Sequence, residues 1–262
     1  AIIASCDVAA AMMEAPGGTA LVEESIAEAL DFRRAMRKVD KEYGRDWWFK
    51  VWGPDKLAAE GIGRADDWVL KAGDKWHGFG DLASGFNLLD PIKSTIITPG
   101  LDVSGKFAKT GIPAAIVTKY LAEHGIVVEK TGLYSFFIMF TIGITKGRWN
   151  TLLTALQQFK DDYDRNAPMW RVLPEFCAAH PRYEATGLRE LCQSIHDMYA
   201  KGDIARLVTE MYLSDLHPAM KPSDAFAHIA HRMTERVPID QLEGRITTSL
   251  LTPYPPGIPL LI

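Results

Sequence analysis

Residues 111–148 read GIPAAIVTKYLAEHG, IVVEKTG and LYSFFIMFTIGITKGR, and their pattern changes from helix to strand and back to helix. The proline suits the first turn of a helix and the glycine after AEH suits a C-terminal cap, so a helix is predicted over Pro113–His124. Two strands should follow, Ile126–Lys130 and the apolar run Phe136–Ile142. A second helix should begin after Thr145. The stretch predicts an α-β-β unit that helices cover on at least one face.

The sequence on either side adds a long helix and two short strands before this unit. The helix is predicted from Thr19 to Gly44, and the strands at Asp46–Trp52 and Leu89–Thr98. Residues 53–85 are rich in glycine and charge and are expected to form a loop. Beyond Asn166 the chain carries several prolines and three further helix patterns. The patterns cover Leu188–Tyr199, Ile204–Tyr212 and Ser223–Arg232, and Arg245–Leu251 is a plausible strand.

The expected fold class is α/β, in three parts. Residues 1–45 end in a long linking helix. Residues 46–166 form a small α/β domain, a mixed sheet with covering helices. Residues 167–262 form a mostly helical C-terminal domain.

Composition excludes several classes of function. The 262 residues carry a net charge of −4 with both signs mixed along the chain, which gives no footprint for nucleic acid or an anionic membrane. Three cysteines at unrelated spacings argue against a disulfide framework. The longest apolar run is too short to cross a bilayer, and the N-terminus lacks a charged leader. We expect a cytoplasmic protein. Both ends are apolar, and we expect an interior piece of a longer polypeptide.

Two charged or polar positions in the EKTG segment are candidates for ligand binding. Glu129 and Thr131 follow a predicted strand, and a carboxylate at such a place pairs well with an ammonium group. The alternative is an exposed acid paired with its neighbour Lys130, a common surface arrangement of small energetic value.

His77 and Tyr254 are the other two candidates for substrate binding. His77 lies between aromatic residues and a glycine, as in a loop folded over a pocket, where a histidine can transfer protons near neutral pH. Tyr254 is held among prolines that would fix the position of its phenol. Each has a structural alternative: packing for His77 and a rigid corner for Tyr254. No set of His, Cys and acidic residues has the spacing of a metal site, so no metal is expected.

The motifs occur in a fixed order across the whole chain: ASCDVAAAMM (4–13), WHGF (76–79), LDPIK (89–93), GIPAAIVTKYLAEHGIVVEKTG (111–132), FTIGITKGR (140–148) and PYPPGIP (253–259). In this combination the sequence resembles the C-terminal part of the bacterial basic amino acid decarboxylases. These are fold-type I pyridoxal phosphate (PLP) enzymes that act on lysine, ornithine or arginine.

The resemblance implies a cofactor domain that ends within residues 1–45, and an active site near Glu129 and Tyr254. Family members hold PLP through a lysine in Ser-x-His-Lys, and no lysine here follows a histidine. The Schiff-base lysine and most cofactor contacts should therefore lie upstream, which leaves no catalytic residue in this segment. The resemblance also implies a homodimer that associates into a larger homo-oligomer.

EKTG and ITKGRW most resemble lysine-type members, so the implied reaction converts lysine to cadaverine and CO₂. Ornithine and then arginine are the alternative substrates. A different class of function also stays open, a non-catalytic binding or interaction module that lacks the PLP lysine. A third alternative is a fragment with no activity of its own.

Overall fold

The computed structural model describes residues 1–54, 68–83, 85, 87–214, 217–248, 250–254 and 257. It divides into two compact units, Ala1–Gly202 and Asp203–Ile262. Parts of the expected 53–85 loop, of the Arg245–Leu251 strand and of the PYPPGIP motif lie outside the described residues. No helix within the described ranges is both long and apolar enough to span a bilayer.

The first unit begins with two helices of different character. Helix α1 (Ile2–Met12) buries none of its residues, whereas α2 (Gly17–Tyr43) buries an apolar stripe that includes Ala29, Phe32 and Met36. These residues recur at three- and four-residue intervals and so share one side of the helix. The predicted long helix is confirmed. It ends at Gly44, where φ is +59° and a short 3₁₀ turn, η1 (Gly44–Asp46), follows.

The sheet of the first unit has four strands in the order β1-β2-β4-β3. They are β1 (Lys50–Val51), β2 (Lys93–Ile97), β3 (Lys130–Thr131) and β4 (Ser135–Met139), and each is shorter than the pattern predicted. All three pairings are antiparallel, so the expected mixed sheet is not what forms.

The path of the chain explains the strand directions. A crossover through helix α3 (Ala114–Glu123) carries the chain from β2 to β3, so these two strands run parallel without pairing. A tight turn then returns β4 between them, with the Gly132 N–H donating to the Ser135 carbonyl at 2.7 Å. Because β4 lies between β2 and β3 and runs opposite to both, its two pairings are antiparallel. The pairing of β1 with β2 is antiparallel as well.

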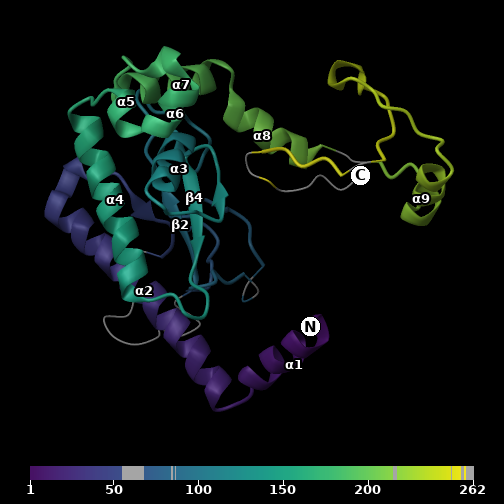
Figure 1. Ribbon diagram of the computed structural model, residues 1–262, viewed down its shortest axis with the longest axis horizontal. Coiled ribbons are helices and arrows are strands. Elements are labelled where there is room, and N and C mark those ends of the chain that lie inside the picture. Colours follow the sequence, from purple (N-terminus) through teal and green to yellow (C-terminus); the bar gives the residue numbers. More distant parts are fainter. Residues whose placement is uncertain are drawn as a thin grey trace. The chain divides into compact units, whose positions relative to one another are not determined.

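Helices cover one face of this sheet, as expected. Ile96 and Phe136 lie opposite each other on that face and are 0% and 1% exposed. They share a core with α2, α3 and α4 (Lys146–Asp164), which begins after Thr145 as predicted. Figure 1 shows α2 and α4 side by side along the sheet, and the two helices contact each other. The α/β fold class is confirmed.

A buried arginine also fastens α2 to the sheet. The two terminal nitrogens of Arg33 donate to the carbonyls of Trp52 and Lys93, both at 2.9 Å, and its guanidinium lies 5.3 Å from the centre of the Trp68 ring. Burial, and then repulsion by Arg37, lower the pKa of Arg33 to about 10. The link joins the helix to the ends of β1 and β2.

Short helices extend the first unit past the predicted boundary at Asn166. They are α5 (Met169–Val172), α6 (Pro174–Ala179), η3 (Pro181–Tyr183) and α7 (Leu188–Lys201). Met169, Leu188 and Cys192 are fully buried in the same core as the sheet. Residues 167–201 therefore pack with the α/β unit, and the compact unit ends at Gly202.

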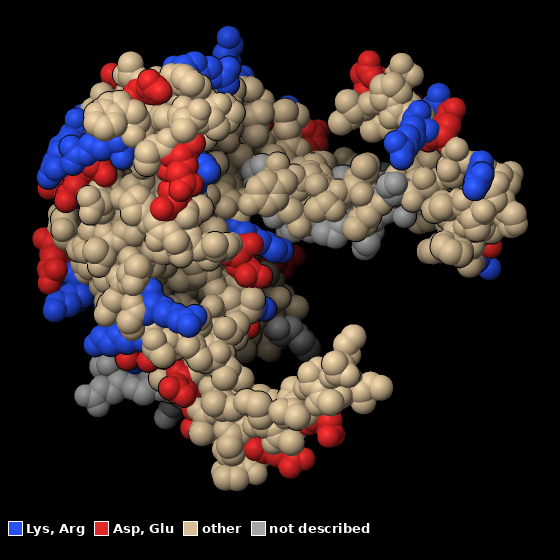
Figure 2. Space-filling model, viewed as in Figure 1, with Lys and Arg blue, Asp and Glu red and all other residues tan. Residues whose placement is uncertain are grey.

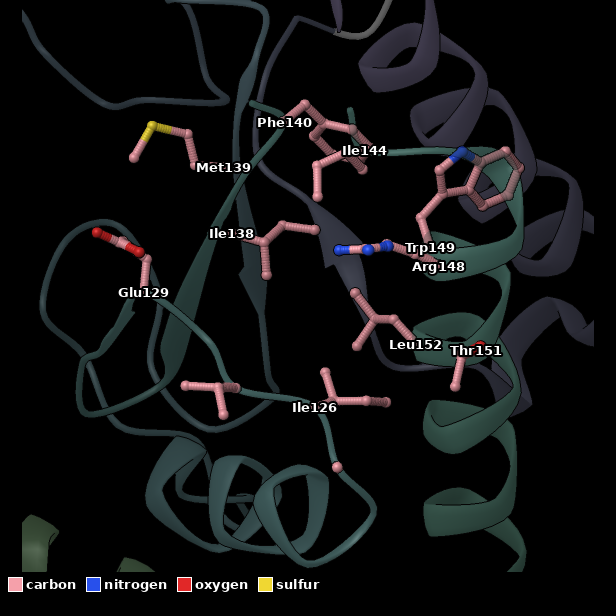
Figure 3. Close-up of a pocket in the computed structure, with 12 residues that line it drawn as sticks. Ile126, Glu129, Ile138, Met139, Phe140, Ile144, Arg148, Trp149, Thr151 and Leu152 are labelled. Atoms are coloured by element: carbon pink, nitrogen blue, oxygen red, sulfur yellow. The ribbon is translucent and has the colours of Figure 1, made fainter. Parts of the chain in front are cut away.

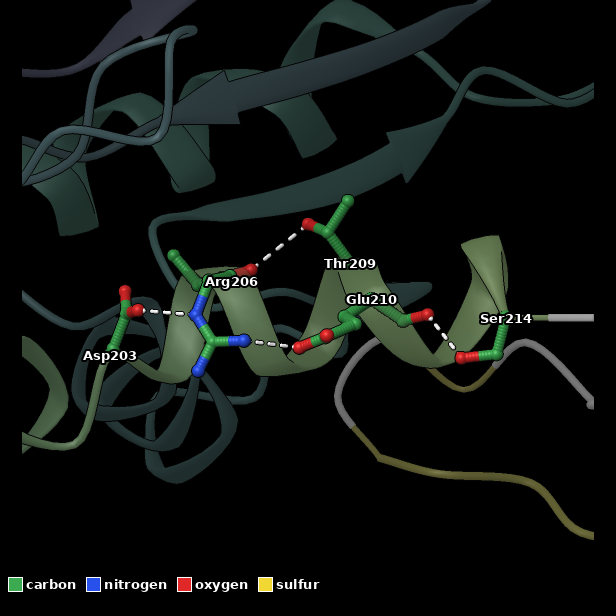
Figure 4. A network of polar contacts seen from close by, with 6 residues as sticks. Asp203, Arg206, Thr209, Glu210 and Ser214 are labelled. Carbon is green, nitrogen blue, oxygen red and sulfur yellow. Dashed lines mark hydrogen bonds and ion pairs between the residues drawn. The ribbon is translucent and has the colours of Figure 1, made fainter.

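The second unit contains α8 (Ile204–Leu213), α9 (Pro222–Ala230) and η4 (Ile239–Gln241). Arg206 pairs with Asp203 at 2.6 Å and with Glu210 one turn later (Figure 4). Among the described residues of this unit, Ala205 alone is buried, so they form little apolar core. Helix α9 begins one residue before the predicted start at Ser223, because Pro222 takes the first helical position. The described part of 245–251 forms no strand.

Candidate functional site

Glu129 lies at the edge of the sheet, just before β3. Its backbone N–H donates to the Phe137 carbonyl at 2.9 Å, which holds the segment beside β4. The side chain is exposed, and among the described residues it forms neither a hydrogen bond nor an ion pair. The alternative pairing with Lys130 is absent, because successive residues of an extended chain point to opposite faces.

A cavity of about 460 Å³ adjoins Glu129 (Figure 3). Its walls are mostly apolar and come from the segment before β3, from β4 and from the first two turns of α4. They include Ile126, Ile138, Phe140, Ile144 and Leu152. Such apolar lining with few polar groups is usual for small-molecule sites.

Arg148 brings a positive charge to the same cavity. Figure 3 shows its guanidinium reaching between Ile138 and Leu152, whereas the Glu129 carboxylate points away from that apolar wall. The cavity thus has an anion on the sheet side and a cation on the α4 side. Sequence reasoning did not select Arg148, since an exposed arginine in the first turn of a helix has no distinctive pattern.

Thr131 is close to Glu129 in sequence but its hydroxyl lies within the protein. The residue is 7% exposed, and its Oγ1 donates to Thr118 Oγ1 of α3 at 3.1 Å. It faces Phe136 across the β3–β4 pair. In this structure Thr131 joins the sheet edge to α3.

His77 is 5% exposed, inside a loop closed by two backbone hydrogen bonds. The Phe79 N–H donates to His77 Nδ1 at 3.0 Å, and the Phe79 ring stacks on the imidazole with centres 5.2 Å apart. The other ring nitrogen, Nε2, is buried without a hydrogen-bond partner among the described residues. The His77 loop lies between β1 and β2 in the sequence, whereas Glu129 lies just before β3.

Tyr254 belongs to the second unit and is 68% exposed. The Gly257 N–H donates to the Pro253 carbonyl at 2.8 Å, and a Cβ at Gly257 would lie 3.1 Å from the Tyr254 ring. Pro253 and Gly257 therefore lie close to each other, with Gly257 beside the Tyr254 ring. The structure thus places Glu129 and Thr131 on one edge, His77 in another loop and Tyr254 in the other unit.

A buried polar pair fastens the loop 99–112 to α7. Tyr134 Oη and His196 Nδ1 are 2.6 Å apart, and His196 Nε2 is 2.9 Å from the Ala108 carbonyl. Since a carbonyl only accepts, Nε2 carries the hydrogen and Nδ1 accepts from the phenol. Burial first, then nearby Tyr199, raises the pKa of Tyr134. Sequence reasoning did not select His196.

Two models of one protein family match most of the chain. Residues 1–148 match the description Orn/Lys/Arg decarboxylase, major domain, and residues 205–262 match Orn/Lys/Arg decarboxylase, C-terminal domain. The chain belongs to the Orn/Lys/Arg decarboxylase family. The resemblance inferred from the motifs is confirmed.

Relatives of this decarboxylase-family chain include enzymes for different substrates. Lysine decarboxylase LdcA of Pseudomonas aeruginosa is 49% identical over 100% of this chain and 35% of its own length. The biodegradative arginine decarboxylase of Escherichia coli is 36% identical over 100% of this chain and 37% of its own. The solved structure of lysine decarboxylase A from P. aeruginosa superimposes with a TM-score of 0.90 at 50% identity, covering 98% of this chain and 35% of that one. The chain spans about a third of the length of these relatives.

No lysine is among the described residues that line the cavity beside Glu129. A Schiff base needs an accessible lysine amine in a pocket. Lys160, the lysine that is buried in the described ranges, pairs with Asp164 and lies 4.9 Å from the Trp48 ring centre. Nor do the described residues bring together three or more His, Cys, Asp or Glu side chains suited to a metal ion.

Proposed function

We propose that this chain is part of a PLP-dependent decarboxylase that converts a basic amino acid, lysine foremost, into a diamine with release of CO₂. The observation that carries the proposal is the Glu129 carboxylate, which is unpaired among the described residues and adjoins an apolar cavity. A distal ammonium group would give this outward-pointing carboxylate its counter-ion.

Identity to the lysine-specific relative supports lysine over arginine. The match is 49% to the P. aeruginosa lysine decarboxylase and 36% to the E. coli arginine decarboxylase. A compact ammonium also needs only one carboxylate, whereas a guanidinium is recognised best through a planar, two-point contact. Ornithine, one methylene shorter, is the second candidate.

In this proposal the chain binds and orients substrate, and the cofactor is held by residues outside it. PLP would supply the electron sink for the loss of CO₂. Residues 1–45 would then be the end of the cofactor domain and 46–166 the small domain. The C-terminal domain was predicted over 167–262, and residues 167–201 of that range pack into the core of the first unit. Glu129, Thr131, His77 and Tyr254 are proposed to contribute to the substrate site, with Thr131 acting by holding the Glu129 segment to α3.

The proposal extends to assembly and location. A homodimer that associates further, with active sites at the dimer interface and a cytoplasmic location, follows from the family resemblance. A site at the dimer interface would also explain why Glu129, at the edge of the sheet, is exposed in the isolated chain.

The test is decarboxylation by the purified full-length polypeptide that contains this chain, loaded with PLP. CO₂ release is measured with lysine, ornithine and arginine in parallel. We expect kcat/KM to be highest for lysine. Preference for arginine would refute the substrate assignment, and no release from any of the three would favour a non-catalytic module.

A further inference from the structure

His77 has a fixed tautomer and an unused hydrogen-bond donor. Its Nδ1 accepts from the Phe79 N–H at 3.0 Å, so this nitrogen carries no hydrogen. The ring hydrogen is then on Nε2. That atom is buried and has no acceptor among the described residues. Buried polar groups are nearly always paired, so an unpaired N–H in a 5%-exposed side chain indicates an acceptor that the described chain does not supply.

The imidazole cannot turn to find another partner. The Trp76 ring meets it edge to face at 4.6 Å, and the Phe79 ring stacks on it at an interplanar angle of 25°. The loop is closed by hydrogen bonds from the Gly73 N–H to the Phe79 carbonyl at 2.9 Å and from the Gly78 N–H to the Asp74 carbonyl at 3.1 Å. The donor is therefore preorganised.

A neighbouring segment holds the loop from outside. A Cβ added to Gly78, where φ is +75°, would lie 3.1 Å from Val103 Cγ2. Only glycine permits both this conformation and this approach. The residue whose ring stacks on His77, Phe79, is 49% exposed, so its outer side faces solvent. Phe79 thus covers one face of the imidazole, while the Nε2–H lies in the plane of the ring.

We propose that the Nε2–H of His77 donates to an oxyanion oxygen, the carboxylate of the amino acid substrate. This assignment rests on the proposed function. A basic amino acid offers two ammonium groups, which only donate, and one carboxylate, which only accepts. A donor such as His77 is matched to the carboxylate, and an acceptor such as Glu129 to the distal ammonium. His77 thus orients the group that leaves as CO₂, and its own hydrogen stays in place throughout.

Two substitutions separate the donor from the loop contact. His77→Asn keeps an acceptor near the Nδ1 position for the Phe79 N–H but has no donor at the Nε2 position. His77→Gln places an amide N–H near Nε2 but loses the acceptor for Phe79. His180→Asn, at an exposed histidine of the same unit, is the matched control.

The measurements use the full-length PLP-loaded protein. We expect His77→Asn to raise KM for lysine about tenfold or more, as loss of a hydrogen bond to a charged group predicts. His77→Gln should raise KM less, and His180→Asn should leave it unchanged. The affinity for 1,5-diaminopentane, measured by calorimetry, should not change in His77→Asn, because this diamine has no carboxylate. Glu129→Gln should weaken binding of both lysine and the diamine.

Several outcomes would overturn the assignment: an unchanged KM in His77→Asn, equal weakening of lysine and diamine, or a larger loss in His77→Gln than in His77→Asn. Weaker retention of PLP with an unchanged KM for lysine would place the acceptor on the cofactor phosphate and would also overturn it. Thermal midpoints of each variant identify losses due to unfolding. If the wild type releases no CO₂ from lysine, the proposed function fails. The role of His77 is then still tested by calorimetry, which compares the affinities of the wild type and of His77→Asn for lysine and for 1,5-diaminopentane.

Discussion

Replacing Gly111 with alanine should destabilise the first unit by driving a methyl group into the Tyr134–His196 pair. The added Cβ would lie 2.2 Å from His196 Nδ1 and 2.9 Å from Gly100 Cα. Neither neighbour yields easily, because His196 is 1% exposed and is held by Tyr134 and by the Ala108 carbonyl. The ring or the loop backbone must therefore move.

Two effects set the expected size. Overpacking of a buried site costs about 1–3 kcal/mol. Separation of the phenol from the imidazole leaves a buried donor and acceptor unpaired, at a further cost of about 1–3 kcal/mol. The two costs are not fully additive, because a shift of the His196 ring that relieves the overpacking is the same shift that breaks its hydrogen bond. We therefore expect the free energy of unfolding to fall by about 2–5 kcal/mol.

Urea unfolding of the full-length protein, followed by circular dichroism, measures the change. Gly147→Ala in α4 is the matched control, because the nearest atom to its added Cβ is Thr145 Oγ1 at 4.0 Å. This variant should gain about 0.5–1 kcal/mol from the better helix former. Tyr134→Phe should cost less in the Gly111→Ala background than alone, since the pair is already broken. Gly111→Ala within about 0.5 kcal/mol of wild type would refute the packing argument.

Three further expectations concern other parts of the first unit. Glu129→Gln should raise KM for lysine strongly in steady-state assays while PLP binding stays intact, and unchanged lysine kinetics would remove Glu129 from the substrate site. Leu156 is 0% exposed, so Leu156→Ala should lower the free energy of unfolding by about 2–5 kcal/mol in a urea titration, and a loss below about 1 kcal/mol would show that the core refills the space. Burial raises the pKa of the Cys192 thiol to about 12, so its thiolate is scarce near neutral pH. In peptide mass mapping an alkylating reagent should therefore label exposed Cys6 in the native protein and Cys192 only after unfolding; rapid native labelling of Cys192 would show that the core opens readily.

The strand and helix signals in residues 111–148 were informative because each is local. Pro113, Gly125 and Thr145 mark the ends of elements through the backbone angles and hydrogen bonds they allow, and these act within a few residues. Strand lengths and directions were predicted less well. They depend on which strand pairs with which, a long-range property that β4 decides by entering between β2 and β3.

The candidate site divides in the same way. The acid in EKTG and the histidine in WHGF could be selected from the sequence, because their residue types limit the chemistry they perform. That Thr131 is committed to Thr118, that Arg148 reaches the cavity of Glu129, and that His77 keeps one unused N–H could not be selected. The first two depend on contacts between separate elements, whereas the tautomer of His77 is set by the Phe79 N–H two residues away.

The sequence by itself determined the family and the order of helices and strands in residues 111–148, and it limited the candidates for binding a charged substrate, because motifs, caps and side-chain chemistry are properties of short segments. Tertiary structure alone decided the antiparallel sheet, the inclusion of residues 167–201 in the first core and the tautomer of His196. The reason is that burial and hydrogen bonding across distant segments give each group its partners, and partners determine what a side chain can do.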